Sequence, residues 1–205
     1  MLTVNGDRDV VEAQLERGEL ACPLCSGLLA GWGDAVPRRA RQLGEDENGQ
    51  VRFEVVTPRR SRCRGCGATH VLLPVQCLLR RADAAAVIGA ALEKNAAGAG
   101  HRTIARELKR PAETVRGWLR RFAVRAEAVR AFFTVLLART NPDPVMPAAA
   151  SGPVAAAVSA IAGAAAAVAQ RWPQVGMVPV WAAASAASGG LLLAPGWPAA
   201  GRNAT

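Results

Sequence analysis

Two Cys-x-x-Cys pairs constrain the fold of this 205-residue chain more than any other feature of its sequence. The first pair is Cys22 and Cys25, and the second is Cys63 and Cys66. A spacing of two residues lets both sulfurs of a pair reach one ion from a single tight turn. Two such turns complete a tetrahedral shell of thiolates that leaves no open position for water. The pattern therefore predicts one structural zinc ion bound by these four cysteines, and no catalytic metal.

Two other uses of paired cysteines fit this sequence less well. A redox pair lies beside a strand–helix unit, whereas both pairs here have loop-like surroundings. Disulfides suit secreted chains, but residues 1–20 contain five acidic residues and no apolar core of a signal peptide. We therefore expect a cytoplasmic protein. We interpret Cys77 as a small buried hydrophobe, and His70 as a strand-end or packing residue instead of a ligand.

The cysteine region, residues 20–76, has the element order of a zinc ribbon, and residues 1–19 are treated as a separate N-terminal segment. A polar turn over 45–49 ends in Asn-Gly, which favours a hairpin. The strict alternation of 51–55 predicts a half-buried strand, and 69–73 is a second strand candidate. A segment this short buries little apolar surface, so the metal is expected to supply most of its stability.

The positive charge of the chain is regional. The net charge is +9, and residues 1–140 hold 23 Lys/Arg against 15 Asp/Glu. Such a bias is expected where a chain meets a polyanion, although an arginine excess can also follow from a GC-rich coding sequence. Four arginines crowd the second cysteine pair, where they fit either compensation of a negative zinc–thiolate centre or contact with phosphate: Arg59, Arg60, Arg62 and Arg64.

Residues 101–122 have the spacing of a helix-turn-helix within a helical bundle over 80–139. The apolar positions recur with helical periodicity on two inner faces: Ile104, Ala105 and Leu108, then Val115, Trp118, Leu119 and Phe122. Pro111 is well placed to open the second helix. The pattern departs from the common form at the turn, where Lys109 and Arg110 replace the usual Gly and apolar residue.

The turn and the outward face of the second helix are distinctly basic, because residues 101–125 carry eight Lys/Arg against two Glu. A recognition helix places such residues against DNA, with Arg116 and Arg120 near base edges and Arg121 and Lys109 near phosphate. The predicted DNA-binding residues are Lys109, Arg110, Glu113, Thr114, Arg116, Gly117, Arg120 and Arg121. The alternative is a plain helical hairpin with a solvated basic face.

The runs CRGCGATHVLLP and GHRTIARELKRPAETVRGWLRRF resemble an actinobacterial family of zinc-ribbon plus helix-turn-helix proteins of unassigned function. They are also similar to the N-terminal DNA-reading part of insertion-sequence transposases. The resemblance covers roughly residues 20–140. It implies DNA binding through Arg116, Gly117, Arg120 and their neighbours, and zinc binding by the four paired cysteines. It implies no particular target or pathway.

The remaining third of the chain differs in composition. The helix expected over 124–139 has a broad apolar stripe, which predicts packing on the bundle or a homodimer. A Pro-rich linker over 140–153 precedes an alanine-rich extension over 154–205. Alanine contributes little to membrane insertion, and prolines and glycines interrupt 175–198, so a soluble helix followed by a poorly ordered tail is favoured over a membrane span.

These patterns predict a mainly α protein with a small β zinc ribbon, a helix-turn-helix bundle and an alanine-rich extension. No enzyme is expected, because Asp143 is the only acid beyond Glu127 and cannot complete a carboxylate metal site, and because no small-molecule substrate is evident. The predicted function is sequence-specific DNA binding in the nucleoid, as a transcriptional regulator or a transposase-derived DNA binder. The alternatives are a protein-interaction or assembly module and a membrane-tethered regulator.

Overall fold

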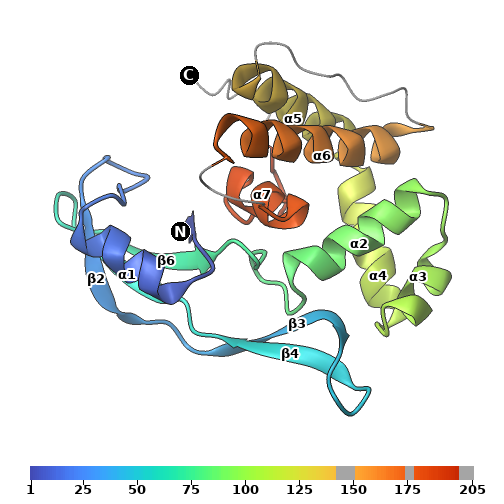
Figure 1. Ribbon diagram of the computed structural model, residues 1–205, viewed down its shortest axis with the longest axis horizontal. Coiled ribbons are helices and arrows are strands. Elements are labelled where there is room, and N and C mark those ends of the chain that lie inside the picture. The colour runs from blue at the N-terminus through green and yellow to red at the C-terminus, as the bar shows by residue number, and fades with distance from the viewer. Residues whose placement is uncertain (142–150, 174–177, 199–205) are drawn as a thin grey trace.

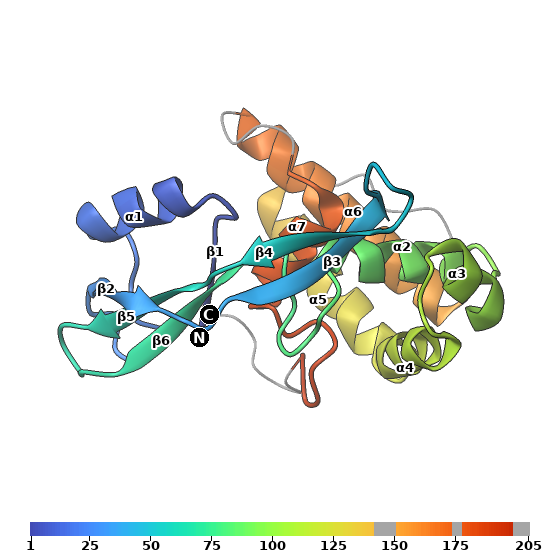
Figure 2. The same ribbon diagram turned by 90° about the horizontal axis from the view of Figure 1, so that it is seen from below.

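The computed structural model describes residues 1–141, 151–173 and 178–198, and the protein has a mixed α/β fold (Figures 1 and 2). Helices account for 45% of it and strands for 21%. The expectation of a mainly α protein was therefore too helical. Several strands were missed because their sequences lack apolar alternation; RRARQLGE and RRSRC are two examples.

The N-terminal part forms a β-rich module around the cysteines. Its elements are β1 (Leu2–Val4), α1 (Arg8–Glu16), β2 (Leu29–Asp34), β3 (Arg38–Glu45), β4 (Val51–Val56), β5 (Arg59–Cys63) and β6 (Thr69–Pro74). Four of the strands form one sheet in the order β1-β6-β5-β2, while β3 and β4 form a separate two-stranded ribbon. The strands predicted over 51–55 and 69–73 are confirmed as β4 and β6.

The first residues belong to this module and are not the separate segment expected over 1–19. Strand β1 pairs in parallel with β6, with Leu2 opposite Leu72. Helix α1 begins after Asp7, whose side chain accepts a hydrogen bond from the N–H of Asp9. Its buried face joins a small core that includes two of the cysteines: Val4, Val11, Leu15, Cys22, Leu29, Cys63 and Leu72. The N-terminal segment therefore covers the cysteine region.

The β3–β4 ribbon is closed by the polar turn that the sequence predicted. The carboxylate of Asp46 accepts hydrogen bonds from the N–H groups of Asn48 and Gln50, at 3.0 and 2.9 Å. Gly49 has a φ of +70°, a left-handed conformation that glycine adopts without steric cost. The ribbon extends from the sheet toward the helical part of the molecule (Figure 2).

The helical part packs around one large core. Its helices are α2 (Ala85–Ala96), α3 (His101–Glu107), α4 (Ala112–Ala123), α5 (Ala126–Thr140), α6 (Pro153–Arg171) and α7 (Val180–Ala187). The pair of helices expected within 101–122 and the helix expected over 124–139 are confirmed within a few residues at their ends. Most of the linker expected over 140–153 lies outside the described residues.

Helix α6 lies along α5 in the same chain (Figure 1). The apolar stripe of α5, with Val129, Phe133 and Leu137, is buried. The packing of α6 within the same chain accounts for the buried part of the stripe that had suggested a homodimer.

The end of the described chain is folded, contrary to the poorly ordered tail expected over 175–198. Trp181 on α7 is 6% exposed, and its indole N–H donates to Glu93 at 2.7 Å. Its ring lies directly over Gly89 of α2, where a Cβ would meet ring atoms at 2.1 Å. Leu192 and Leu193 are buried in the same core. The extension is therefore an integral part of the helical core.

Candidate metal centre and nucleic-acid interface

The two cysteine pairs come together because β2 and β5 pair in antiparallel register, with Leu29 opposite Cys63. The four sulfurs lie within 4.8 Å of one another. The sulfurs of Cys22 and Cys66 are 3.8 Å apart, and those of Cys25 and Cys63 are 3.4 Å apart. A tetrahedral zinc site with bonds of about 2.3 Å places its sulfurs about 3.8 Å apart. The four cysteines therefore fit one four-coordinate metal ion.

The two pairs are also the same local structure. The N–H groups of Cys22 and Cys63 each donate, at 2.8 Å, to the carbonyl five residues further on. The carbonyls of the same two cysteines accept from the N–H four residues further on, at 2.8 and 3.1 Å. Ser26 and Gly67, which follow the second cysteine of each pair, have φ values of +59° and +73°. Such a repeated turn presents both sulfurs of a pair on one side.

The protonation of the cluster is uneven. The N–H groups of Cys66 and Gly65 donate to the sulfur of Cys63 and lower the pKa of this thiol to about 6. The N–H of Ala68 lowers the pKa of Cys66. The hydrogen bond between Cys66 and Cys25, together with burial, outweighs this effect and raises the pKa of Cys66 to about 11. Thiolates this close repel one another, and a divalent cation compensates that repulsion.

His70 is a site residue whose role the sequence did not reveal. It lies on β6 and is buried, with Nε2 at 3.3 Å from the sulfur of Cys22. Nδ1 lies 3.4 Å from the main-chain nitrogen of Met1, a donor, so Nε2 carries the ring hydrogen and donates to Cys22. Burial lowers the pKa of His70, which keeps the ring neutral. The sequence does contain one indication of this position: His70 is two residues from Leu72, so both lie on the same, buried side of β6.

Replacing His70 by Ala is expected to weaken zinc binding by about 10–100-fold, because partners of ligands orient them and tune their basicity. The four thiolates remain, so binding is weakened and not abolished. Competition with a chromophoric chelator measures the affinity. His101→Ala, which changes the other histidine of the chain, is the matched control. Equal affinities of the His70 and His101 variants contradict the assignment.

The inner faces of α3 and α4 are buried as the helical periodicity predicted. Ile104 and Ala105 of α3 face the core. Trp118 is 3% exposed and is accompanied on α4 by Val115, Leu119 and Phe122. The helical phase of the predicted recognition helix is thus confirmed, and its opposite face is directed to solvent.

The turn between the two helices is well formed even though it lacks glycine. The N–H of Arg110 donates to the carbonyl of Ala105 at 2.8 Å, and the N–H of Lys109 donates to that of Arg106 at 3.2 Å. This is the hydrogen-bond pair of a Schellman motif. Lys109 has a φ of +50° and takes the left-handed position usual for glycine. Its ammonium contacts the carboxylate of Glu45 at the end of β3, beside the turn of the ribbon.

Arg110, one of the predicted DNA-binding residues, is buried and is bound within the protein. It is 7% exposed, and its Nε donates to Oδ1 of the buried Asp83 at 2.6 Å. Further guanidinium hydrogens reach the carbonyls of Leu108, at 3.0 Å, and Gln42, at 3.2 Å. Arg110 therefore connects the turn of the helix pair to β3. A helix-turn-helix usually has a buried apolar residue at this position. Here the position is also buried, but it holds the charged Arg110, which is paired with Asp83.

Apart from Lys109 in the turn, the remaining predicted DNA-binding residues lie on α4. Arg116, Arg120 and Arg121 are exposed, as is Glu113, while Thr114 and Gly117 are half-buried. Glu113 and Arg116 form an exposed ion pair at 2.9 Å. Exposed pairs of this kind contribute little to stability, so Arg116 is free to exchange its partner for a ligand.

The arginines near the second cysteine pair have different surroundings. The guanidinium of Arg59 binds Glu12 at 2.6 Å, and that of Arg62 lies over the ring of Trp32, 4.9 Å from its centroid. Arg60 and Arg64 are exposed. Arg59 is thus engaged within the module. Arg60 and Arg64 are exposed, so either expected role, compensation of the zinc–thiolate charge or contact with phosphate, is possible for them.

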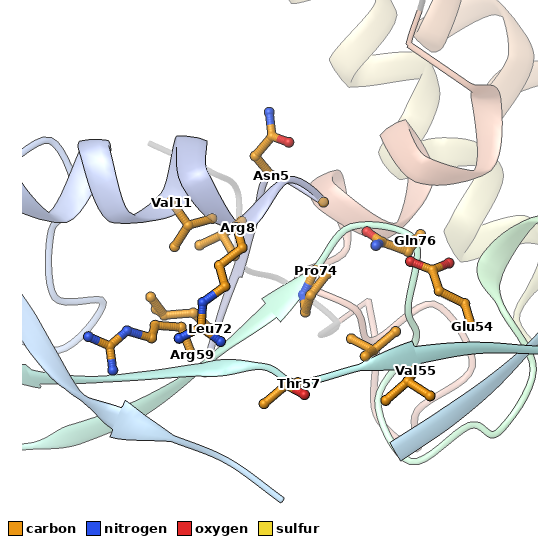
Figure 3. A pocket seen from close by; sticks show the side chains of 13 residues that line it. Asn5, Arg8, Val11, Glu54, Val55, Thr57, Arg59, Leu72, Pro74 and Gln76 are labelled. Atoms are coloured by element: carbon orange, nitrogen blue, oxygen red, sulfur yellow. The ribbon is translucent and has the colours of Figure 1, made fainter. Parts of the chain in front are cut away.

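A hollow of about 270 Å³ lies between the β1–α1 segment and strands β4 and β5. Figure 3 shows Arg8 and Arg59 on one side of it and Glu54 and Gln76 on the other. Arg8 donates to Asp34 at 3.0 Å, so both arginines already have carboxylate partners. The hollow offers no pair of groups arranged for acid–base or nucleophilic chemistry.

No protein-family model, curated protein or solved structure matches this chain. What the fold and the sites define is a mixed α/β protein with a four-cysteine cluster and a basic helix face. Its functional interpretation rests on the geometry of these two sites.

Proposed function

We propose that this protein binds DNA in a sequence-specific manner through α4, with zinc holding the β-rich module together. The observation that carries the proposal is the division of α4 into two faces. Trp118 and its apolar neighbours anchor one face in the core, while Arg116, Arg120 and Arg121 project from the other. A rigidly anchored helix with an arginine-rich outer face is suited to the major groove of DNA.

The arginines of α4 are placed for two kinds of contact with DNA, to base edges and to phosphates. Arg116 and Arg120 lie four residues apart and share one side of the helix, so both can approach base edges in the groove. Arg121 lies to one side of them, where the phosphate backbone runs. Base contacts supply sequence preference, and phosphate contacts supply affinity that depends on salt.

Zinc has a structural role in this proposal. Cys22, Cys25, Cys63 and Cys66 hold the ion, which joins the two cysteine turns into one unit. The β3–β4 ribbon then leads from this unit to the turn of the helix pair, where Arg110 binds Asp83. The metal therefore supports the position of α4 and takes no part in a reaction.

Two observations favour other roles, and each has its own test. Exposed apolar side chains on the ribbon, with Val55 67% and Phe53 40% exposed, suit a protein-interaction module. Such an interface is insensitive to salt, whereas DNA binding weakens steeply as salt rises. Within the described residues α6 is long and apolar enough to cross a membrane, but one of its faces packs on α5 and α2. Fractionation of cells separates a tethered regulator from a soluble one.

Arg116→Ala is expected to weaken binding to the preferred duplex by about 1–3 kcal/mol and to relax its sequence preference. The reason is the loss of a bidentate contact with a guanine edge. A preferred duplex is first selected from a random-sequence library with the zinc-loaded protein. Binding to that duplex and to a scrambled one is then measured at several salt concentrations.

Arg139→Ala is the matched control, because Arg139 is an exposed arginine near the far end of α5. It is expected to leave the preference unchanged. Equal losses on selected and scrambled DNA for Arg116→Ala would leave a nonspecific basic surface. Absence of DNA binding by the unaltered protein at low salt would favour the interaction module. Whether the protein acts as a transcriptional regulator or as a transposase-derived binder is decided by where it binds on a genome.

A further inference from the structure

An open hollow of about 400 Å³ lies beside α4, and one of its walls comes from outside the helix pair. That wall is Arg81, in the segment that links β6 to α2. The hollow is lined by Arg81, Glu113, Thr114, Arg116, Gly117, Trp118, Arg120 and Arg121. Four arginines therefore line one hollow.

Gly117 leaves room on the surface of α4 for the guanidinium group of Arg121. A Cβ at this position would lie 2.8 Å from Nη1 of Arg121, so the guanidinium of Arg121 crosses the helix surface where a side chain is absent. Glycine inside a helix is destabilising relative to alanine, which calls for a compensating reason. The space that it leaves for Arg121 is such a reason.

The side chain of Arg81 is anchored by a hydrogen bond to the segment that follows α7. It is half-buried, and its Nη2 donates to the carbonyl of Leu193 at 3.3 Å. Its Nε is buried and has no hydrogen-bond partner within the described part of the chain. Burial, and next the charge of Arg121, lower the pKa of Arg81. Two arginines of like charge therefore line the same hollow, and one of them is partly removed from water.

The charge of this hollow is not balanced by the protein. Glu113 is the single carboxylate among its lining residues, and it pairs with Arg116 at 2.9 Å. Among residues 1–141, 151–173 and 178–198, Arg81, Arg120 and Arg121 form no ion pair with a carboxylate. Like charges held together without a counter-ion destabilise the folded chain, and a bound anion reverses that effect.

We propose that this hollow binds a phosphate oxyanion between Arg81 and Arg121. The planar guanidinium fork matches the oxygens of a phosphate group, which favours it over a monovalent anion. In the DNA complex of the proposed function the group is a backbone phosphate beside the bases that α4 reads. The assignment of this phosphate group to DNA rests on the proposed function. The oxyanion site itself does not, because it is defined by the residues that line the hollow.

The first test uses inorganic phosphate and no DNA. Phosphate is titrated at low salt into the zinc-loaded full chain while the arginine Nε–H signals are followed by nuclear magnetic resonance. Saturable shifts are expected for Arg81 and Arg121. Gly117→Ala keeps every charge but displaces the guanidinium of Arg121, so it is expected to weaken phosphate binding at least several-fold. Arg81→Gln is expected to abolish saturation, and Arg139→Gln, with the same change of charge elsewhere, is expected to change nothing.

The second test uses the selected and scrambled duplexes. Arg81→Gln is expected to weaken both equally and to reduce the slope of log K against log salt by about 0.9, the value for one phosphate. Between 50 and 200 mM salt the unaltered protein then loses about 3–4-fold more affinity than the variant does. Thermal melting of each variant without ligand establishes that it is folded.

The outcomes separate the two proposals. Saturable phosphate binding without any DNA binding supports the oxyanion site, assigns it to a free phosphate ligand and overturns the proposed function. DNA binding in which Arg81→Gln behaves like Arg139→Gln, together with linear, non-saturating phosphate shifts, overturns the site and leaves the function standing. If Gly117→Ala binds phosphate as the unaltered protein does, the placement of Arg121 over Gly117 is not part of the site, and the proposal fails.

Discussion

Cys63→Ser is expected to remove zinc from the protein and to unfold the end of the β-rich module that surrounds the cysteines. A serine hydroxyl stays protonated at neutral pH and replaces a thiolate poorly, so the four-coordinate shell is lost. Structural zinc sites contribute apparent binding free energies of about 10–16 kcal/mol in small domains, comparable with the whole stability of many proteins. Cys63 is also 2% exposed within the core shared with α1, so its neighbours lose packing.

Metal analysis and amide hydrogen exchange measure this result together. Purified, reduced protein is expected to contain about one zinc per chain, because the four sulfurs form one site. In the variant, rapid exchange is expected in β2, β5 and β6, with slow exchange retained in α2, α4 and α5. Cys77→Ala is the matched control, since Cys77 is buried but lies outside the cluster.

Two other results would contradict this picture. Unaltered protein that contains no zinc would leave the cysteine cluster as an ordinary thiol cluster. Loss of protection throughout the helices of the variant would show that the module and the bundle unfold as one cooperative unit. The contacts between β3 and residues 82–84, such as the hydrogen bond from the N–H of Arg41 to the carbonyl of Ala82, are the route by which such coupling would act.

Asp83→Ala is expected to destabilise the protein by about 3–5 kcal/mol, because it leaves a buried arginine without its partner. Asp83 and Arg110 have side chains that are 5% and 3% exposed, and they are joined at 2.6 Å. Arg41 approaches the other oxygen of Asp83 at 3.5 Å, so the carboxylate serves both the helix-pair turn and β3. Its removal is therefore expected to disturb the approach of the ribbon to α4 as well as stability.

Urea unfolding measures the free energy, and an exposed ion pair supplies the comparison. Glu113→Ala breaks the pair with Arg116, whose side chains are 74% and 61% exposed, and is expected to change stability by less than about 1 kcal/mol. Replacing both buried partners, as Asp83→Leu with Arg110→Met, is expected to recover much of the loss, since no unpaired charge then remains. An Asp83→Ala variant as stable as Glu113→Ala would mean that Arg110 reaches solvent.

The parts of this structure that were predictable from the sequence depend on near neighbours in the chain. The Cys-x-x-Cys spacing predicts the two metal-binding turns, since both sulfurs of a pair belong to one turn. The periodicity of Val115, Trp118, Leu119 and Phe122 predicts the buried face of α4, because residues three and four apart share a side of a helix. The Asn-Gly turn between β3 and β4 is equally local.

The parts that escaped prediction depend on pairings between distant segments. Strand β1 is too short and too plain to be recognised, and it becomes a strand because β6, about seventy residues away, offers it a free edge. Trp181 is placed by the bare surface at Gly89 of α2. The position of Arg81 beside Arg121, forty residues apart in sequence, likewise follows from the packing of separate segments.

The cysteine turns, the helices and the buried face of α4 can be predicted from the amino-acid sequence, because they follow from residue spacing within one or two turns. Whether each basic side chain is buried or exposed depends instead on contacts between distant segments of the chain. Arg110 and Arg116 are both arginines of one basic stretch, yet Arg110 is buried against Asp83 while Arg116 remains exposed. The difference arises because burying a charge requires a partner, and folding brings Asp83 to only one of them.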